Sequence, residues 1–266
     1  MLFLNTESQY AMDRYKPYSI FTPPFEIASG GIRVMWGLFG WLLAKGQIVQ
    51  VNTTFDIPFI GIYPEIYHGN DLRAGTVVRY ILNKPGVMGN YGIPGPTQFD
   101  SSDKLYYFSR IFAPDDVKEE QIMFLPIINL HLFKDQKKTR NKTCYFIGKG
   151  QNTNQHPPDS ILIDRRFAIN QQALADLLNE CHTMYSYDPV SAMFEIARLC
   201  GTRVVVFPIE EYKYDLTKYE PGLNGISIYP QTDNKLDVEE FRNHYEEMVQ
   251  EFSEKLDNFI EETQHD

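Results

Sequence analysis

The chain has 266 residues, of which 43% are hydrophobic, and it contains 18 Phe and 17 Tyr. This content is sufficient for a packed core and excludes a disordered or collagen-like chain. The 25 basic and 35 acidic residues give a net charge of −10, which argues against a protein that binds nucleic acid over a broad surface. Three dispersed cysteines without a C-x-x-C spacing exclude a disulfide scaffold and a Cys-based zinc site.

The beginning of the chain and its apolar stretches bear on the compartment. The first residues lack the basic region of a secretory signal. The longest apolar stretch, Val34 to Ala44, is far shorter than the ~20 residues that a membrane span requires. The sequence therefore predicts a cytoplasmic protein without a transmembrane span.

The first half of the chain begins with the pattern of a βαβ unit. A short strand starts at Tyr18, and apolar residues then recur at helical spacing behind Ser29 until Gly46. The segment Gln47 to Asn52 follows as a short apolar strand. Two strands joined by a helix predict parallel pairing.

A second unit of the same kind is predicted after it. Residues Pro58 to Tyr63 form an expected buried strand, and Asp71 is expected to cap a helix. The apolar positions of this helix are Leu72, Val77, Val78, Ile81 and Leu82. Pro85 and Gly86 would end it.

The second half begins after a change of composition. Five of the nine residues in Lys134 to Lys142 are basic and none is hydrophobic, so we place the interdomain linker there. Strands and helices then alternate, which predicts a mainly parallel sheet. The expected strands are 143–147, 160–163, 183–187 and 203–208, and the expected helices begin at Asn170 and at Asp188.

The last segment has the clearest helical pattern. Between Val238 and Phe259, apolar residues recur at spacings of three and four, and the segment from Leu236 to the end carries eleven acidic and two basic residues. We expect the apolar stripe to pack on the first domain, or alternatively to form a dimer interface. The predicted domains are residues 1–135, residues 140–236 and a C-terminal helix over residues 237–266.

Several motifs of catalytic and cofactor sites do not occur. The sequence has no P-loop, no H-E-x-x-H, no EF-hand loop and no Asp-x-Asp pair, so no metal site is predicted. Gly148-Lys149-Gly150 is the nearest approach to a dinucleotide fingerprint, but its third glycine is missing. A Rossmann dehydrogenase is therefore not expected.

Three features remain that could hold a phosphorylated ligand. Gly30 and Gly31 open a predicted helix, where backbone N–H groups favour an anion. Asp188 and Ser191 open another, with Glu195 one turn further on. The positive charges Lys149 and Arg165 follow the ends of predicted strands, the edge at which open α/β sheets bind ligands. A tight turn, an ordinary helix cap and a plain charged surface are the alternative interpretations.

Two blocks of sequence resemble a known family. The first runs from Ser29-Gly-Gly-Ile-Arg-Val-Met-Trp through Ile62-Tyr-Pro-Glu-Ile66 to Val78-Arg-Tyr-Ile-Leu-Asn-Lys-Pro-Gly86. The second contains Tyr185-Ser-Tyr-Asp-Pro-Val-Ser-Ala192, Phe194-Glu-Ile-Ala-Arg-Leu-Cys-Gly201 and Val204-Val-Val-Phe-Pro208. Both resemble bacterial and viral glycosyltransferases of the GT-B fold, of the group 1 type.

The resemblance implies two Rossmann-like domains, with a nucleotide-sugar on the second and an acceptor on the first. Ser191 and Ala192 would then contact the diphosphate of a UDP- or GDP-sugar, and Glu195 the ribose. Tyr187 stands where many retaining members carry the first of two glutamates. Lys149 and Arg165 would balance the leaving diphosphate, and Gly30, Gly31 and Gly148 would let ligand approach the backbone.

The expected activity is therefore a retaining, metal-independent sugar transfer to a glycan, lipid or protein acceptor. The nucleotide-sugar is a substrate, and no cofactor is implied. The candidate acid or base groups are His68, which we prefer, and Glu65. Two other functions remain open: a non-catalytic nucleotide-sugar-binding protein and a nucleotide-sugar epimerase. The sequence leaves the oligomeric state undecided.

Overall fold

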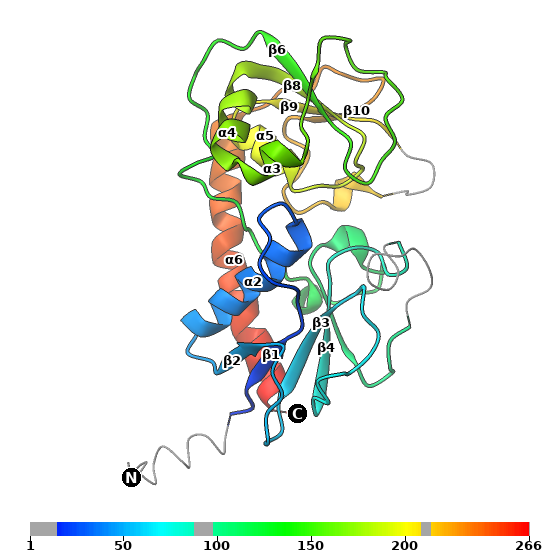
Figure 1. Cartoon of the computed structure of the whole chain (residues 1–266), viewed down its shortest axis with the longest axis vertical. Helices are drawn as coiled ribbons and strands as arrows, with labels where there is room; N and C mark the ends of the chain where they lie inside the picture. The colour runs from blue at the N-terminus through cyan, green and yellow to red at the C-terminus, as the bar shows by residue number, and fades with distance from the viewer. Residues whose placement is uncertain (1–14, 88–97, 209–213, 266) are drawn as a thin grey trace. The chain divides into compact units, whose positions relative to one another are not determined.

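The computed structural model describes residues 15–87, 98–208 and 214–265 (Figure 1). The chain divides into two compact units. Unit 1 holds the described residues up to Phe25, then Gly31–Leu125 and the chain from Gln250 onward. Unit 2 holds Glu26–Gly30 and Pro126–Val249.

Unit 1 is built on a five-stranded sheet in which all paired strands are parallel. The strand order is β2-β1-β3-β4-β5. The bounds are β1 Tyr18–Ile20, β2 Val49–Val51, β3 Ile60–Pro64, β4 Thr76–Ile81 and β5 Lys104–Tyr107. Helix α2, Gly30–Ala44, connects β1 to β2, and the predicted βαβ unit is confirmed.

The helix predicted behind Asp71 is wrong. Residues Thr76–Ile81 form strand β4, which pairs with β3 and β5 and is buried at its last four positions. A strand covered on both faces has a continuous apolar run instead of an alternating one, and such a run is easily mistaken for a helix. The β-branched residues Thr76, Val77 and Val78 are the signal that favours the strand.

Unit 2 also contains a five-stranded parallel sheet, in the order β10-β9-β8-β6-β7. Its strands are β6 Lys142–Phe146, β7 Ile161–Leu162, β8 Cys181–Ser186, β9 Arg203–Val206 and β10 Ile226–Ile228. Its helices are α3 Arg165–Ile169, α4 Gln171–Glu180 and α5 Met193–Leu199, of which α4 packs on β8 and α5 on β9. Short 3-10 turns occur at Arg110–Phe112, Glu119–Gln121 and Leu216–Lys218. The predicted α/β class with parallel sheets is thus confirmed.

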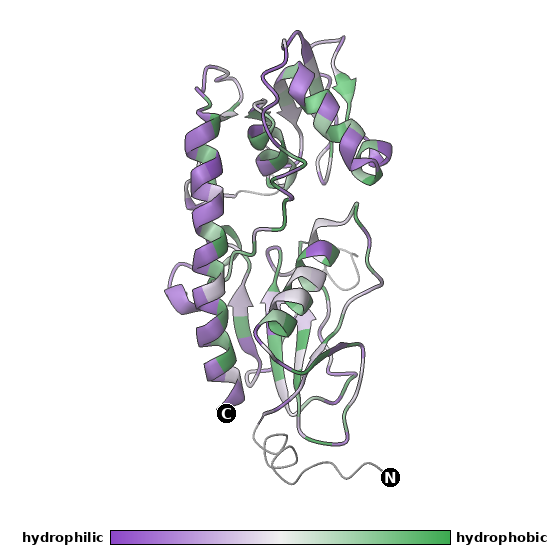
Figure 2. Ribbon diagram, turned by 90° about the vertical axis from the view of Figure 1, so that its left-hand side faces the viewer, coloured by the Kyte–Doolittle hydropathy of each residue, from purple (hydrophilic) through white to green (hydrophobic). Residues whose placement is uncertain are grey.

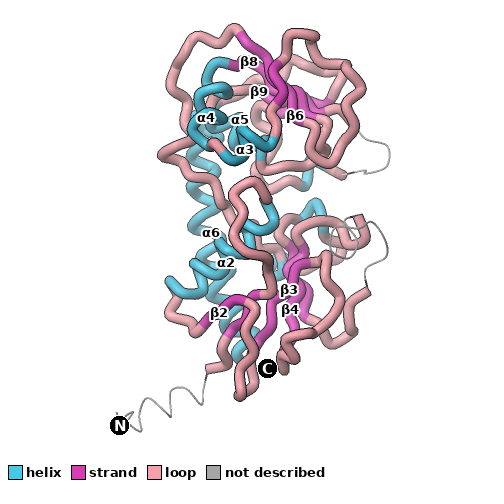
Figure 3. Tube along the Cα trace, in the orientation of Figure 1, coloured by secondary structure: helices cyan, strands magenta, loops and turns pink. Residues whose placement is uncertain are grey.

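The two sheets share one topology. Counted in chain order within each unit, both have the strand order 2-1-3-4-5, which is the doubly wound order found in flavodoxin-like sheets. The order reverses direction between β1 and β3 in unit 1, and between β6 and β8 in unit 2. Loops rather than helices form several of the connections, as Figure 3 shows in pink. Ligands of such sheets bind at the carboxyl ends of the two strands that flank the reversal, which we call the switch point.

The C-terminal helix α6, Val238–Gln264, belongs to unit 2 up to Val249 and to unit 1 from Gln250. In unit 1 Phe259 stacks on Tyr18 with ring centroids 6.1 Å apart, and Phe252 meets Trp41 at 5.5 Å. Figure 2 shows hydrophobic residues interspersed along this mostly polar helix. Within the described part of the chain, no helix is both long enough and apolar enough to cross a membrane.

The basic segment in which the sequence places the linker packs on unit 2. Arg140 donates to the backbone carbonyls of Leu178 and Cys181 at 3.1 Å, and to that of Cys200 at 2.6 Å. It also pairs with Asp135 at 2.6 Å. Arg140 therefore satisfies carbonyl groups at the C-terminal ends of α4 and α5, and this basic residue has a local structural cause.

Candidate functional site

A charged pair lies at the switch point of unit 2. Lys149 comes shortly after β6, and Asp188 shortly after β8, the neighbouring strand. The Lys149 Nζ atom lies 2.9 Å from Asp188 Oδ1 and donates to the Val190 carbonyl, also at 2.9 Å. The Asp188 side chain is 3% exposed and that of Lys149 is 32% exposed. The buried carboxylate thus holds a partly accessible ammonium group at this edge of the sheet.

Two glycines allow this close approach. Gly148 has φ +54°, and a Cβ atom there would lie 2.2 Å from Asp188 Oδ2. A Cβ at Gly150 would lie 1.7 Å from the backbone oxygen of Tyr187. Neither position therefore accepts a side chain unless the loop after β8 moves. The Gly-x-Gly pattern that resembled part of a dinucleotide motif is required by the packing of two strand ends.

The prediction that Asp188 caps the next helix is wrong. Helix α5 begins only at Met193, and its N-cap residue, Ala192, makes no side-chain hydrogen bond there. The Asp188 carboxylate instead accepts from Val190 N at 3.2 Å and binds Lys149. Ser191 accepts from Met193 N at 3.3 Å, so Ser191 and Ala192 precede α5 and remain beside the switch point.

Tyr187 ties the loop after β6 to the end of β8. Its buried hydroxyl accepts from Gln155 N at 3.0 Å and lies 2.8 Å from His156 Nδ1. The hydroxyl has one proton, which it donates to His156 when that nitrogen is unprotonated. Burial lowers the pKa of His156 and favours this neutral form. His156 also stacks on Tyr145 with centroids 3.8 Å apart, so Tyr187 positions the loop that carries Lys149.

Glu195 lies in a buried polar contact of unit 2. It is 4% exposed, and its carboxylate accepts a hydrogen bond from the Tyr219 hydroxyl. Burial and, next, the neighbouring Glu195 carboxylate raise the pKa of Tyr219 well above its usual value. The ribose role of Glu195 therefore stays a prediction, and in this structure its carboxylate binds a side chain of its own unit.

Arg198, one turn after Glu195, is fully buried. It donates to the carbonyls of Pro221, Gly222 and Asn224 at 2.9 to 3.1 Å, and its guanidinium lies 3.8 Å from the ring centroid of Phe241 on α6. Burial lowers its pKa to about 10. This residue joins α5 to the loop before β10 and to α6, which the sequence does not indicate.

The other predicted donor residues have contacts of their own. Arg165 begins α3 after the edge strand β7, is 72% exposed and pairs with Glu26. Gly30 begins α2, and a Cβ atom there would meet nothing within 4 Å. The structure therefore brings together Gly148, Lys149, Tyr187, Asp188 and Ser191, with Ala192 adjacent.

The switch point of unit 1 is uncharged at its first strand. Asn52 has φ +50°, and its side-chain amide bonds both backbone groups of Thr22, accepting from N at 3.0 Å and donating to O at 2.7 Å. Thr22 follows β1 and is 2% exposed. Its hydroxyl has no hydrogen-bond partner within the described part of the chain. The sequence does not predict the contact between Asn52 and Thr22, because the apolar pattern extends the expected strand through Asn52.

Glu65 directly follows β3, the other strand of this switch point. Its carboxylate is 5% exposed and accepts from Leu82 N at 2.9 Å, just after β4. Burial raises the pKa of Glu65 to about 7, and the hydrogen bond from Leu82 opposes that rise. A Cβ atom at Gly31 would lie 3.5 Å from the Leu82 side chain. Leu82 thus contacts both Glu65 and the first turn of α2, and the Glu65 carboxyl exchanges its proton near neutral pH.

His68 lies on the loop between β3 and β4. Arg79 holds this loop on both sides of it, with hydrogen bonds of 3.0 Å to the carbonyls of Tyr67 and Gly69. His68 Nδ1 lies 3.5 Å from Gln98 N, a long contact. Glu65 is therefore the better placed of the two predicted acid or base groups, because it lies at the strand end itself.

Over residues 15–87, 98–208 and 214–265, no group of three or more His, Cys, Asp or Glu side chains could hold a metal ion. Comparisons with known proteins add little. No protein-family profile and no curated protein matches the chain. A solved structure of a functionally uncharacterised protein from Klebsiella pneumoniae is similar at 13% identity and a TM-score of 0.37, over 80% of this chain and 92% of that chain. That likeness supports no fold family and no function.

Proposed function

We propose that the chain is a glycosyltransferase that moves a sugar from a UDP- or GDP-sugar to a glycan, lipid or protein acceptor. The observation that carries the proposal is the Lys149–Asp188 pair at the switch point of a parallel sheet. The GT-B arrangement, a retaining and metal-independent reaction and a cytoplasmic location belong to the same proposal. The resemblance of the Tyr185 to Pro208 block to the donor-binding region of that family supports it.

The donor diphosphate would lie beside the carboxyl ends of β6 and β8. The Lys149 ammonium is partly accessible, and the Ser191 hydroxyl can donate a hydrogen bond to a phosphate oxygen. Charge develops on the diphosphate as the bond to the sugar breaks. A fixed ammonium at that position stabilises this charge without needing to reorganise. Asp188 and the two glycines keep Lys149 in place.

Proton transfer in this proposal involves unit 1. The acceptor hydroxyl loses a proton to Glu65 or to the leaving phosphate itself. With a pKa of about 7, Glu65 is partly ionised at neutral pH and can act in either direction. The pH dependence of kcat/KM would then show a limb close to pH 7.

The direct test is incubation of the full chain with UDP- and GDP-sugars, with and without an acceptor panel, while released nucleotide and sugar identity are measured. A transferase releases nucleotide in step with glycosylated product. Epimerised donor without release would indicate an epimerase, and binding without either product would indicate a binding protein. If a chelator abolished the activity and manganese restored it, the proposal that the reaction needs no metal would be contradicted.

Two lysines at opposite ends of β6, one that begins the strand and one that follows it, sharpen the test. Lys149→Met should lower kcat/KM at least tenfold, because it removes a charge-assisted contact. Lys142 begins β6, at the end of the strand that is opposite to Lys149, and pairs with Glu180 at the surface. Lys142→Met should leave turnover unchanged. Equal turnover of both variants would contradict the proposed donor site.

A further inference from the structure

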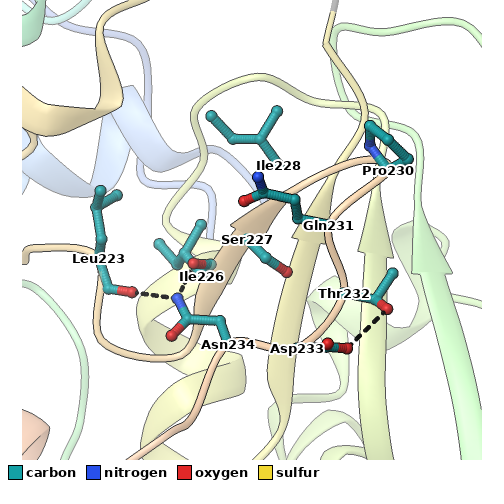
Figure 4. A pocket seen from close by; sticks show the side chains of 9 residues that line it. All are labelled: Leu223, Ile226, Ser227, Ile228, Pro230, Gln231, Thr232, Asp233 and Asn234. Atoms are coloured by element: carbon teal, nitrogen blue, oxygen red, sulfur yellow. Dashed lines mark hydrogen bonds between the residues drawn. The ribbon is translucent and has the colours of Figure 1, made fainter.

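Unit 2 has a second concave site at its edge strand. A pocket of about 570 Å³ lies along β10, which is separated from β8 in the sheet by β9 (Figure 4). Nine residues line it: Leu223, Ile226, Ser227, Ile228, Pro230, Gln231, Thr232, Asp233 and Asn234. None of them belongs to the donor site proposed above, so the pocket requires its own explanation.

The lining combines an aliphatic surface with neutral polar groups. Leu223, Ile226, Ile228 and Pro230 supply the aliphatic part, and Leu223 and Ile228 are 37% and 47% exposed. The hydroxyl and amide side chains and the single carboxylate of Asp233 supply the polar part. Contact between water and these two aliphatic side chains is unfavourable. A ligand with an apolar face would cover the side chains and displace the water.

Two common classes of ligand do not fit this lining. Among the nine lining residues there is no Lys, Arg or His to neutralise a phosphate. There is also no Phe, Tyr, Trp or His on which a nucleobase could stack. The remaining polar groups are neutral or negative, so the pocket favours a ligand that is uncharged and rich in hydroxyl groups.

One polar side chain of the lining holds the backbone of the pocket in place, and two others can contact a ligand. The Asn234 amide donates to the carbonyls of Leu223 and Ile226, which fixes the returning segment against β10 (Figure 4). Gln231 donates its backbone N–H to the Ile228 carbonyl at 2.9 Å. Its side-chain amide makes no hydrogen bond within the part of the chain that the structure describes, and Asp233 has only a 3.4 Å contact with Thr232. Gln231 and Asp233 can therefore turn toward a ligand.

We infer that this pocket binds a neutral carbohydrate of one or two sugar rings. A sugar ring has an apolar face of C–H groups, which matches the aliphatic surface, and hydroxyls that both donate and accept, which match an amide and a carboxylate. The volume lies in the range of small-molecule sites. The inference does not depend on the proposed transferase activity, because it concerns another part of the sheet.

The test is calorimetry and saturation-transfer NMR on the full chain, with a panel of neutral mono- and disaccharides, uridine, guanosine and inorganic phosphate. At least one neutral sugar should bind, and Asp233→Ala should weaken its binding about tenfold or more, with a smaller loss for Gln231→Ala. Both side chains are exposed, so neither change should alter the melting temperature. Asp56→Asn, an exposed acid in unit 1, is the matched control and should bind the sugar normally.

Three outcomes would overturn the inference. The first is that no sugar of the panel binds at millimolar concentration, and the second is that the two pocket variants bind it as the parent does. The third is that uridine, guanosine or phosphate displaces the sugar from this pocket. If Lys149→Met abolished sugar binding while Asp233→Ala preserved it, the sugar would be bound at the switch point instead. That result would favour the proposed donor site and reject the carbohydrate pocket.

Discussion

Units 1 and 2 arrange five parallel strands in the same order. They differ in the residues that follow the two strands at the switch point. Unit 2 carries the Lys149–Asp188 ion pair, with the ammonium partly accessible. Unit 1 carries the buried Thr22 and the buried carboxyl of Glu65. One topology thus presents a fixed positive charge in one unit and a titrating acid in the other. The strand order positions a site, and the residues that follow the strands decide its chemistry.

The largest effect should come from filling the space that keeps the two strand ends of unit 2 together. Gly150→Ala places a Cβ atom against the backbone oxygen of Tyr187 and should cost about 3 kcal/mol or more in the free energy of unfolding. Gly40→Ala on α2, where a Cβ meets nothing within 4 Å, should instead stabilise the protein by about 0.5–1 kcal/mol. Urea denaturation measures both. A Gly150→Ala variant as stable as the parent would contradict the close packing at this switch point.

The second effect tests the acid of unit 1. The native state of the parent holds the Glu65 proton more tightly than the unfolded state, so stability is fully present below pH 4.5 and falls as the pH rises through about 7. Glu65→Gln does not titrate there. Its stability relative to the parent should therefore increase by about 3 kcal/mol between pH 4 and pH 8.

The matched control for this pH series is Glu251→Gln, an exposed position on α6. Its stability difference from the parent should be constant across the same range. A flat difference for Glu65→Gln would show that the Glu65 carboxyl ionises normally, and the contrast between the two switch points would lose its basis.

A third prediction separates two roles of Glu195. Glu195→Gln keeps an oxygen that accepts from Tyr219 but removes the negative charge beside the buried Arg198, so the free energy of unfolding should fall by about 1–3 kcal/mol. If the carboxylate also contacts a ribose, calorimetry should show a loss of about 1.5–3 kcal/mol in nucleotide affinity. Unchanged affinity would remove Glu195 from the donor site and leave it a structural role within unit 2.

The smallest effect concerns the ion pair itself. Asp188→Asn keeps the acceptor for Val190 N but removes the charge that faces Lys149, and it should cost about 1–2 kcal/mol in stability. Asp164→Asn, in an exposed pair with Arg166, should cost less than Asp188→Asn, because water screens that pair and Asn also caps helices well. Chemical denaturation at low salt compares them. Equal losses in the free energy of unfolding would mean that burial does not strengthen the Lys149–Asp188 ion pair.

The sequence predicted the elements that have a clear local signal and failed where burial or strand order decides. Helix α2 and the cap at Asn170 follow from periodicity and side-chain chemistry, and the structure confirms both. Strand β4 was mistaken for a helix because both of its faces are covered. The cap at Asp188 failed because its carboxylate has a closer partner in Lys149, which follows β6 and lies 39 residues away in the chain.

The candidate site shows the same division. Strand-end positions singled out Lys149, Asp188 and Glu65 from the sequence alone. Their pairing required the knowledge that β8, and not only β7, lies beside β6. The raised pKa of Glu65 depends on tertiary burial, and the Tyr187 contact with His156 depends on the course of a loop. No local pattern carries that information.

Arg198 has a consequence for the behaviour of unit 2 in salt. Its guanidinium donates to four backbone carbonyls and lies over the face of Phe241, and no water reaches it. Dissolved ions weaken attractions between charges at a surface, as between Lys142 and Glu180, but they do not enter a fully enclosed contact. The junction of α5, the loop before β10 and α6 should therefore keep its strength from dilute buffer to molar sodium chloride. An Arg198→Lys protein would lose it at every ionic strength, because an ammonium has no second nitrogen to donate to the Phe194 carbonyl and no planar face to lie on the Phe241 ring.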